Sequence, residues 1–98
     1  MPLSPKTPTE VKDYGLEWED ALAEGDAISG SAWEVTPTGL VVGDSTVAGT
    51  ITLARFLEGV QGATYTAINT ITTANGETLQ GAIQIEVLSP ADIAGAGL

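Results

Sequence analysis

The chain of 98 residues contains no cysteine and no histidine. Without cysteine it has no disulfide and no thiolate for zinc binding or redox chemistry. Without histidine it lacks the commonest general base and the commonest ligand of transition metals, so no serine has a histidine to activate it. The lysines that would have to act in its place, Lys6 and Lys12, lie in or beside a proline-rich N-terminal stretch. We therefore predict that the protein is not an enzyme and has no cofactor.

Basic residues are also scarce, because Lys6, Lys12 and Arg55 stand against thirteen acidic residues and the formal net charge is −10. A phosphate backbone or an anionic membrane surface would repel such a chain. No apolar run approaches the roughly 20 residues of a membrane helix, and prolines occupy the stretch where a signal peptide has its apolar core. We expect protein partners with basic or neutral surfaces, and neither nucleic acid nor membrane.

The length fits a single domain. Pro2, Pro5 and Pro8 predict an extended N-terminal arm over residues 1–10, because each proline fixes its own φ and restricts the residue before it. At the other end, Pro90 and a run of alternating alanine and glycine predict a flexible tail over residues 89–98. The folded domain is then expected to cover residues 11–88.

Within that domain, apolar and polar residues alternate with the period of a strand. Strands are expected at residues 11–18, 27–36, 40–42, 46–56, 64–73 and 77–88. Turn signals recur about every 8–12 residues, which is typical of a sandwich or barrel, here an all-β fold of about seven antiparallel strands. Large side chains must fill such a core, and the tryptophans are expected there rather than as platforms for a ligand. The predicted core anchors are Trp18, Trp33, Tyr65, Ile83 and Ile85.

The last two strands can be aligned in more detail through the turn Ala74-Asn75-Gly76. A two-residue Asn-Gly turn would place Ile71 beside Gln80 and mix apolar with polar residues on one face. A three-residue loop with Gly76 in a left-handed bulge instead pairs Ile71 with Leu79. Because a buried face specifies the register, we predict the three-residue loop.

The opposite face of this hairpin carries polar residues that are almost all uncharged. A solvated surface is one interpretation, and a docking face rich in hydrogen-bonding groups is the other, since interface cores are depleted of charge. The candidate docking residues are Thr66, Ile68, Thr70, Thr78, Gln80 and Gln84.

Acidic residues in the predicted loops raise the question of calcium, which takes six to eight oxygen ligands from flexible loops. Glu24, Asp26 and Asp44, together with Asp20, would have to converge at one end of the domain. No segment has the spacing of an EF-hand loop, and plain solvated acids are the alternative. We predict no metal site.

The order of these features resembles a family of small proteins encoded among the virion genes of tailed bacteriophages, the fiber–tail adaptor proteins. The resemblance covers about residues 12–87 and departs from the family pattern at Arg55-Phe56-Leu57-Glu58, where smaller, glycine-rich residues are expected. The segments that carry it are KDYGLEW at residues 12–18, LAEGDAI at 22–28, SAWEV at 31–35, Gly39-Leu40, the step from Gly62 to Tyr65, and TTANG at 72–76.

The resemblance implies an immunoglobulin-like sandwich without enzymatic activity. It implies a structural protein of the virion, made in the cytoplasm of the host bacterium, that docks on tail or fiber subunits and is present in several copies per particle. A decoration or cement protein of the phage capsid is an alternative. An immunoglobulin-like adhesion or carbohydrate-binding module is a further one.

Overall fold

The structure is a computed structural model, and it describes residues 3–93 of the chain. It contains seven strands followed by one short helical turn. Their bounds are β1 Leu3–Lys6, β2 Lys12–Glu17, β3 Ile28–Thr36, β4 Leu40–Ala48, β5 Ile51–Glu58, β6 Thr64–Thr73, β7 Thr78–Val87 and α1 Pro90–Ile93. Within residues 3–93, no helix is long and apolar enough to cross a membrane.

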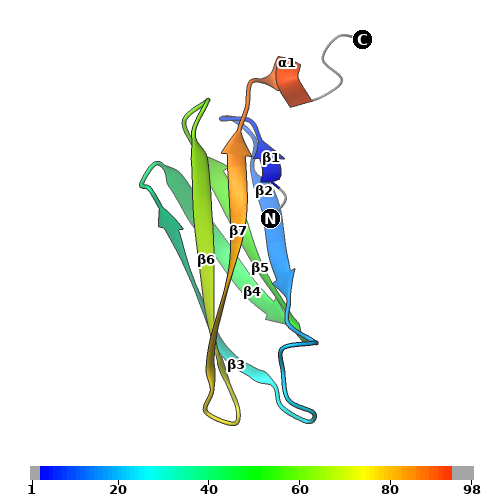
Figure 1. The fold of residues 1–98 in the computed structure, drawn as a ribbon. Coiled ribbons are helices and arrows are strands. Elements are labelled where there is room, and N and C mark those ends of the chain that lie inside the picture. The colour runs from blue at the N-terminus through cyan, green and yellow to red at the C-terminus, as the bar shows by residue number, and fades with distance from the viewer. Residues whose placement is uncertain (1–2, 94–98) are drawn as a thin grey trace.

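The strands form two sheets that face each other (Figure 1). One has four strands in the order β1-β7-β6-β3, and the other has three in the order β2-β5-β4. The predicted all-β fold is confirmed, and this arrangement is compatible with a β-sandwich. Its immunoglobulin-like character stays a prediction. Neighbouring strands are antiparallel, as expected, except that β1 runs parallel to β7.

The β6–β7 hairpin has the predicted register. The amide of Thr73 donates to the carbonyl of Glu77 at 2.9 Å, and Gly76 has a φ of 89°. Tyr65 therefore lies opposite Ile85, Ala67 opposite Ile83 and Ile71 opposite Leu79. Glycine suits this loop because a residue with a Cβ atom rarely adopts a left-handed conformation.

The predicted boundary between the third and fourth strands is wrong. Residues 43–45 are not a turn, because β4 continues to Ala48 through an irregularity between Val42 and Ser45. The chain turns back later, at Gly49, whose φ is 65°. Both places carry a glycine and small polar neighbours, so the local residues fit a bulge and a turn equally well.

The space between the sheets is filled by side chains from both of them, and three of the predicted anchors, Tyr65, Ile83 and Ile85, are buried. Trp18 is buried too, whereas Trp33 is partly buried, its ring meeting that of Phe56 edge-on at 5.7 Å. The central core cluster consists of Leu40, Ala54, Phe56, Tyr65, Ala67, Ile83, Ile85 and Val87.

The N-terminal segment is extended, as its prolines predict, but it is not an arm outside the domain. β1 pairs with the last residues of β7, and Lys6 is fully buried. The Lys6 ammonium donates to the carbonyls of Thr7, at 2.9 Å, and Glu58. The hydroxyl of Tyr14 donates to the carbonyl of Pro5. The expectation that the domain begins at residue 11 is corrected accordingly, because β1 completes the four-stranded sheet.

The C-terminal tail predicted over residues 89–98 lies only partly within the described structure. Pro90–Ile93 forms the short α1 beyond the end of β7, at the top of the sandwich in Figure 1. Residues 94–98 lie outside the described part of the chain.

Candidate functional site

The candidate docking residues lie together on the outer face of the four-stranded sheet. Their partners across β6 and β7 are Thr66 with Gln84, Ile68 with Ala82, Thr70 with Gln80, and Thr72 with Thr78. We call these eight residues the threonine face. The inward side chains between them on β6 are buried, so the alternation of the strand separates a core side from an outer side.

Charged side chains stand only at the margins of this outer face, among the residues that the structure describes. Glu34 of β3 lies beside Ile68, and Glu86 lies toward one end of β7, where Pro5 is its neighbour on β1. The middle of the threonine face is uncharged, and a shallow depression there is lined by Ile68, Gln80, Gly81 and Ala82. An uncharged centre with a charged rim is the distribution found in protein interfaces.

Two polar side chains on this face are held in position by a hydrogen bond across the strands. The side-chain amide of Gln80 donates to the Thr70 hydroxyl at 3.0 Å, which orients both groups across the two strands. Each retains further hydrogen-bonding capacity, because an amide has two donors and two lone pairs and a hydroxyl can both donate and accept. Together with the exposed hydroxyls of Thr72 and Thr78, they offer donors and acceptors without a formal charge.

A buried polar network supports the threonine face from below. The indole N–H of Trp18 donates to the Thr52 hydroxyl at 2.9 Å, and that hydroxyl donates to Asn69 Oδ1 at 2.6 Å. The amide nitrogen of Asn69 then donates to the Ser31 hydroxyl at 2.9 Å and to the carbonyl of Ala32 at 3.0 Å. These bonds join β5 of one sheet to β6 and β3 of the other, and they satisfy polar groups that would be costly to bury alone.

Sequence reasoning missed this network, although a signal was present. Asn69 stands in the inward row of β6 between Ala67 and Ile71, where the alternation calls for an apolar residue. A polar residue at such a position needs a buried partner, and that partner, Thr52, is supplied by the opposite sheet. Nothing local in the chain identifies it.

The lower end of the sandwich is closed by a clamp between the β2–β3 loop and the β6–β7 hairpin (Figure 1). The carboxylate of Asp26 accepts from the amides of Ala27, at 2.8 Å, and Asn75, at 3.0 Å. The amide of Ala74 donates to the carbonyl of Ala27 at 2.8 Å. Desolvation raises the pKa of Asp26, but hydrogen bonds from Ala27 and the hairpin outweigh it and hold that pKa below its ordinary value. The clamp fixes the end of the hairpin that carries Thr72 and Thr78.

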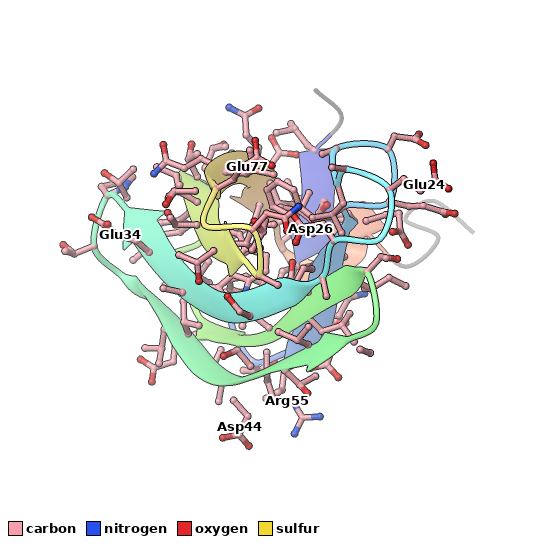
Figure 2. The ribbon with its side chains drawn as sticks, turned by 90° about the horizontal axis from the view of Figure 1, so that it is seen from below. Glu24, Asp26, Glu34, Asp44, Arg55 and Glu77 are labelled. Atoms are coloured by element: carbon pink, nitrogen blue, oxygen red, sulfur yellow. The ribbon has the colours of Figure 1, made fainter. Side chains whose placement is uncertain are left out.

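The acidic residues that would have to converge on calcium do not do so. Figure 2 shows Glu24 and Asp26 in the β2–β3 loop, while Asp44 lies on the far side of the molecule beside Arg55. Across the described residues, no group of three acidic side chains is arranged to hold a metal ion. Asp26 instead accepts through Oδ1 from the backbone amides of Ala27 and Asn75.

Comparison with known proteins bears on the same region of the chain. A family model described as podophage GP4 fiber-tail adaptor protein gp77 matches residues 6–86. The match begins at the buried Lys6 and ends in β7, so it spans both sheets. No curated protein matches the chain.

Proposed function

Because the chain belongs to the podophage fiber-tail adaptor family, we propose that its threonine face docks it on another subunit of the virion. The observation that carries this proposal is an uncharged, hydrogen-bonding surface on a protein with a net charge of −10. The chain has thirteen acidic residues in 98, yet none of them lies at the centre of this sheet face. Depletion of charge lowers the desolvation cost of covering this face with a partner.

The chemistry of the face defines the partner's surface. Ile68 and Ala82 supply a small apolar centre, and the surrounding threonine and glutamine side chains supply hydrogen bonds. We expect a relatively flat, neutral partner surface with complementary donors and acceptors. Basic groups around it would meet Glu34 and Glu86 at the margin and would speed association with so acidic a protein.

In this proposal the protein works by assembly and not by catalysis. Its partners are tail or fiber subunits rather than nucleic acid or membrane, and it is present in several copies per particle. A rigid sandwich suits this role, because an interface that is already ordered costs less conformational entropy to bind. Several copies on a symmetric tail would also add their individual contacts into a stronger attachment.

The test is Thr70→Glu, which places a charge in the middle of the threonine face. Thr38→Glu is the matched control, because Thr38 is exposed in the β3–β4 turn and is not one of the eight residues of the threonine face. Binding of each purified variant to the tail and fiber proteins of the same phage would be measured separately by interferometry, after circular dichroism confirms folding.

We expect Thr70→Glu to weaken binding to one of these proteins about tenfold or more, as for a central interface residue. Thr38→Glu should bind like the wild type. Equal binding of both variants and the wild type to both proteins would refute the proposed docking face. Counting copies per purified particle would separate a tail position, with a few to a few dozen copies, from capsid decoration, with hundreds.

A further inference from the structure

The central strand of the three-stranded sheet, β5, carries apolar residues on both of its faces. Thr52, Ala54 and Phe56 of β5 point into the core and are buried. Its opposite side carries aliphatic residues, and Ile51 is 38% exposed. A strand with apolar residues on both sides is typical of a sheet that is covered on both faces. In this chain, the core covers just one of them.

These outward residues form one surface with their neighbours on β2 and β4. Val41, which is 42% exposed, lies opposite Leu57, while Leu53 lies between Gly15 and Thr46. A Cβ atom at Gly15 would be 2.6 Å from Leu53 Cδ2, so the leucine side chain lies across β2 at this point. We call Val41, Ile51, Leu53 and Leu57 the aliphatic face.

An ion pair divides this surface. The Arg55 guanidinium donates through Nε to Asp13 Oδ1 at 2.9 Å and through Nη2 to Asp13 Oδ2 at 3.2 Å. Asp44 stands beside Arg55 in Figure 2, and Asp13, Asp44 and Arg55 line a pocket on this face together with Leu53. Two carboxylates thus surround one guanidinium, and Glu17 adds a third at the Ile51 end. The surroundings of the aliphatic face are therefore net negative.

We propose that the aliphatic face is a second docking surface, for a protein subunit that presents aliphatic side chains beside lysine or arginine. This subunit differs from the one at the threonine face, because an uncharged polar surface and an acid-flanked aliphatic surface require different complements. This inference rests on the proposed function, because it assigns a second partner to the adaptor. The two surfaces lie on opposite sides of the sandwich, so both can be occupied at once.

Charge complementarity selects this occupant over a second copy of the chain. Two copies would bring together two molecules that each carry a net charge of −10. A symmetric contact through this face would also bring the carboxylates of Asp13, Glu17 and Asp44 from both copies into one interface, and like charges across an interface oppose association. A basic partner surface would instead pair with these carboxylates.

The test compares Val41→Glu with Val60→Glu, which is the same substitution at an exposed valine in the β5–β6 loop. Both variants and the wild type would be titrated with the purified tail protein and the purified fiber protein of the same phage. Of these two proteins, one should bind the Thr70→Glu variant as well as it binds the wild type. We expect Val41→Glu to weaken binding to that protein about tenfold. Val60→Glu should bind both proteins like the wild type.

The possible outcomes separate the two proposals. If Val41→Glu changes neither interaction, or weakens the same interaction as Thr70→Glu, the second docking surface is refuted, and the Thr70→Glu result alone decides the proposed function. If Thr70→Glu has no effect but Val41→Glu does, the threonine face fails and the aliphatic face stands as a docking site. Sedimentation of the wild type as a dimer that Val41→Glu dissociates would assign the face to a second copy and overturn the proposal.

The basic character of the partner has its own test in Asp44→Asn. At low ionic strength this variant should bind the same partner several-fold more weakly, and the difference should shrink in high salt because exposed charges are screened. Unchanged or tighter binding would contradict a basic partner. A Glu24→Gln variant, altered in the distant β2–β3 loop, controls for the change in net charge.

Discussion

The outer faces of the two sheets follow the same alternation of side chains, yet they present different chemistry. On the threonine face, the apolar residues of β6 and β7 point mostly inward, and the outward side is polar and uncharged. On the aliphatic face, β5 has apolar residues outward as well, and charges stand around and between them. Alternation therefore decides which residues form the core, while the outward residues carry separate information about what covers each sheet.

The two faces share one core, which holds two kinds of contact between the sheets. Asn69 of β6 and Thr52 of β5 carry a polar network that crosses this core. Phe56 of β5 packs against aromatic neighbours, Tyr14 at 6.5 Å and Trp33 at 5.7 Å between ring centroids. Polar networks specify one geometry because every member needs its partner, whereas apolar contacts tolerate small shifts.

The largest effect is expected from a substitution that breaks the polar network of Asn69. Asn69→Ala removes the amide that joins Thr52 to Ser31 and Ala32, leaving buried polar groups without partners. We expect the free energy of unfolding to fall by about 3 kcal/mol, measured by urea denaturation. Thr70→Ala, one residue away but outward, is the control and should cost less than about 1 kcal/mol. Equal losses for the two variants would show that the network contributes little.

The next effect concerns the edge of the four-stranded sheet. Lys6→Ala removes the buried ammonium that holds β1 against the carbonyl of Glu58, and we expect a loss of about 2 kcal/mol. Hydrogen exchange should then accelerate in the part of β7 that pairs with β1, residues 84–87. Lys12→Ala is the control, since Lys12 lies over the Tyr14 ring at the surface. Unchanged exchange in Lys6→Ala would mean that β1 is held by other contacts.

The clamp at the lower end of the threonine face makes stability depend on pH. Because the pKa of Asp26 is lowered in the folded protein, its contribution is present above the unfolded pKa and is lost as pH falls through the folded pKa. In urea titrations, the free energy of unfolding of the wild type should fall between about pH 7 and pH 3. In Asp26→Asn this fall should be smaller, because the carboxylate that titrates in the wild type is absent. A wild-type pH dependence unchanged by this substitution would exclude Asp26 as a contributor.

The smallest effect is expected on the aliphatic face. Arg55→Gln removes the ion pair with Asp13. The side chain of Arg55 is 50% exposed and that of Asp13 is 54% exposed. Such surface pairs contribute at most about 1 kcal/mol, so the thermal midpoint should change little. A loss comparable to that of Asn69→Ala would mean that the ion pair stabilises the fold and would weaken its assignment to a docking surface.

The sequence alone predicts the fold correctly where the turn residues and the pattern of buried apolar residues favour the same arrangement. In the β6–β7 hairpin, the inward apolar row and Gly76 favour one register, and the structure has it. Around β4 the local residues do not decide the arrangement. A glycine is found both at a bulge and at a turn, and only the pairing with β5 distinguishes the two. The burial of Lys6 depends on Glu58, which is distant in sequence, so the residues of the N-terminal segment predict only an extended arm.

The candidate site was predictable in part for the same reason. The placement of these residues on one face follows from the register of one hairpin, which the sequence predicts. The aliphatic face needs the placement of β5 between β2 and β4, and the predicted strand over residues 46–56 joined the end of β4 to β5. Its one visible signal was the departure from the family pattern at Arg55-Phe56-Leu57-Glu58, which contributes Arg55 and Leu57 to this face.

The most direct measurement is a density map of the assembled phage tail at a resolution that shows side chains. We expect Thr70 and Gln80 to be covered by one neighbouring subunit, and Val41 and Leu57 to be covered by a different one with basic residues near Asp44. Both faces exposed to solvent, with the protein attached through its loops alone, would contradict this expectation.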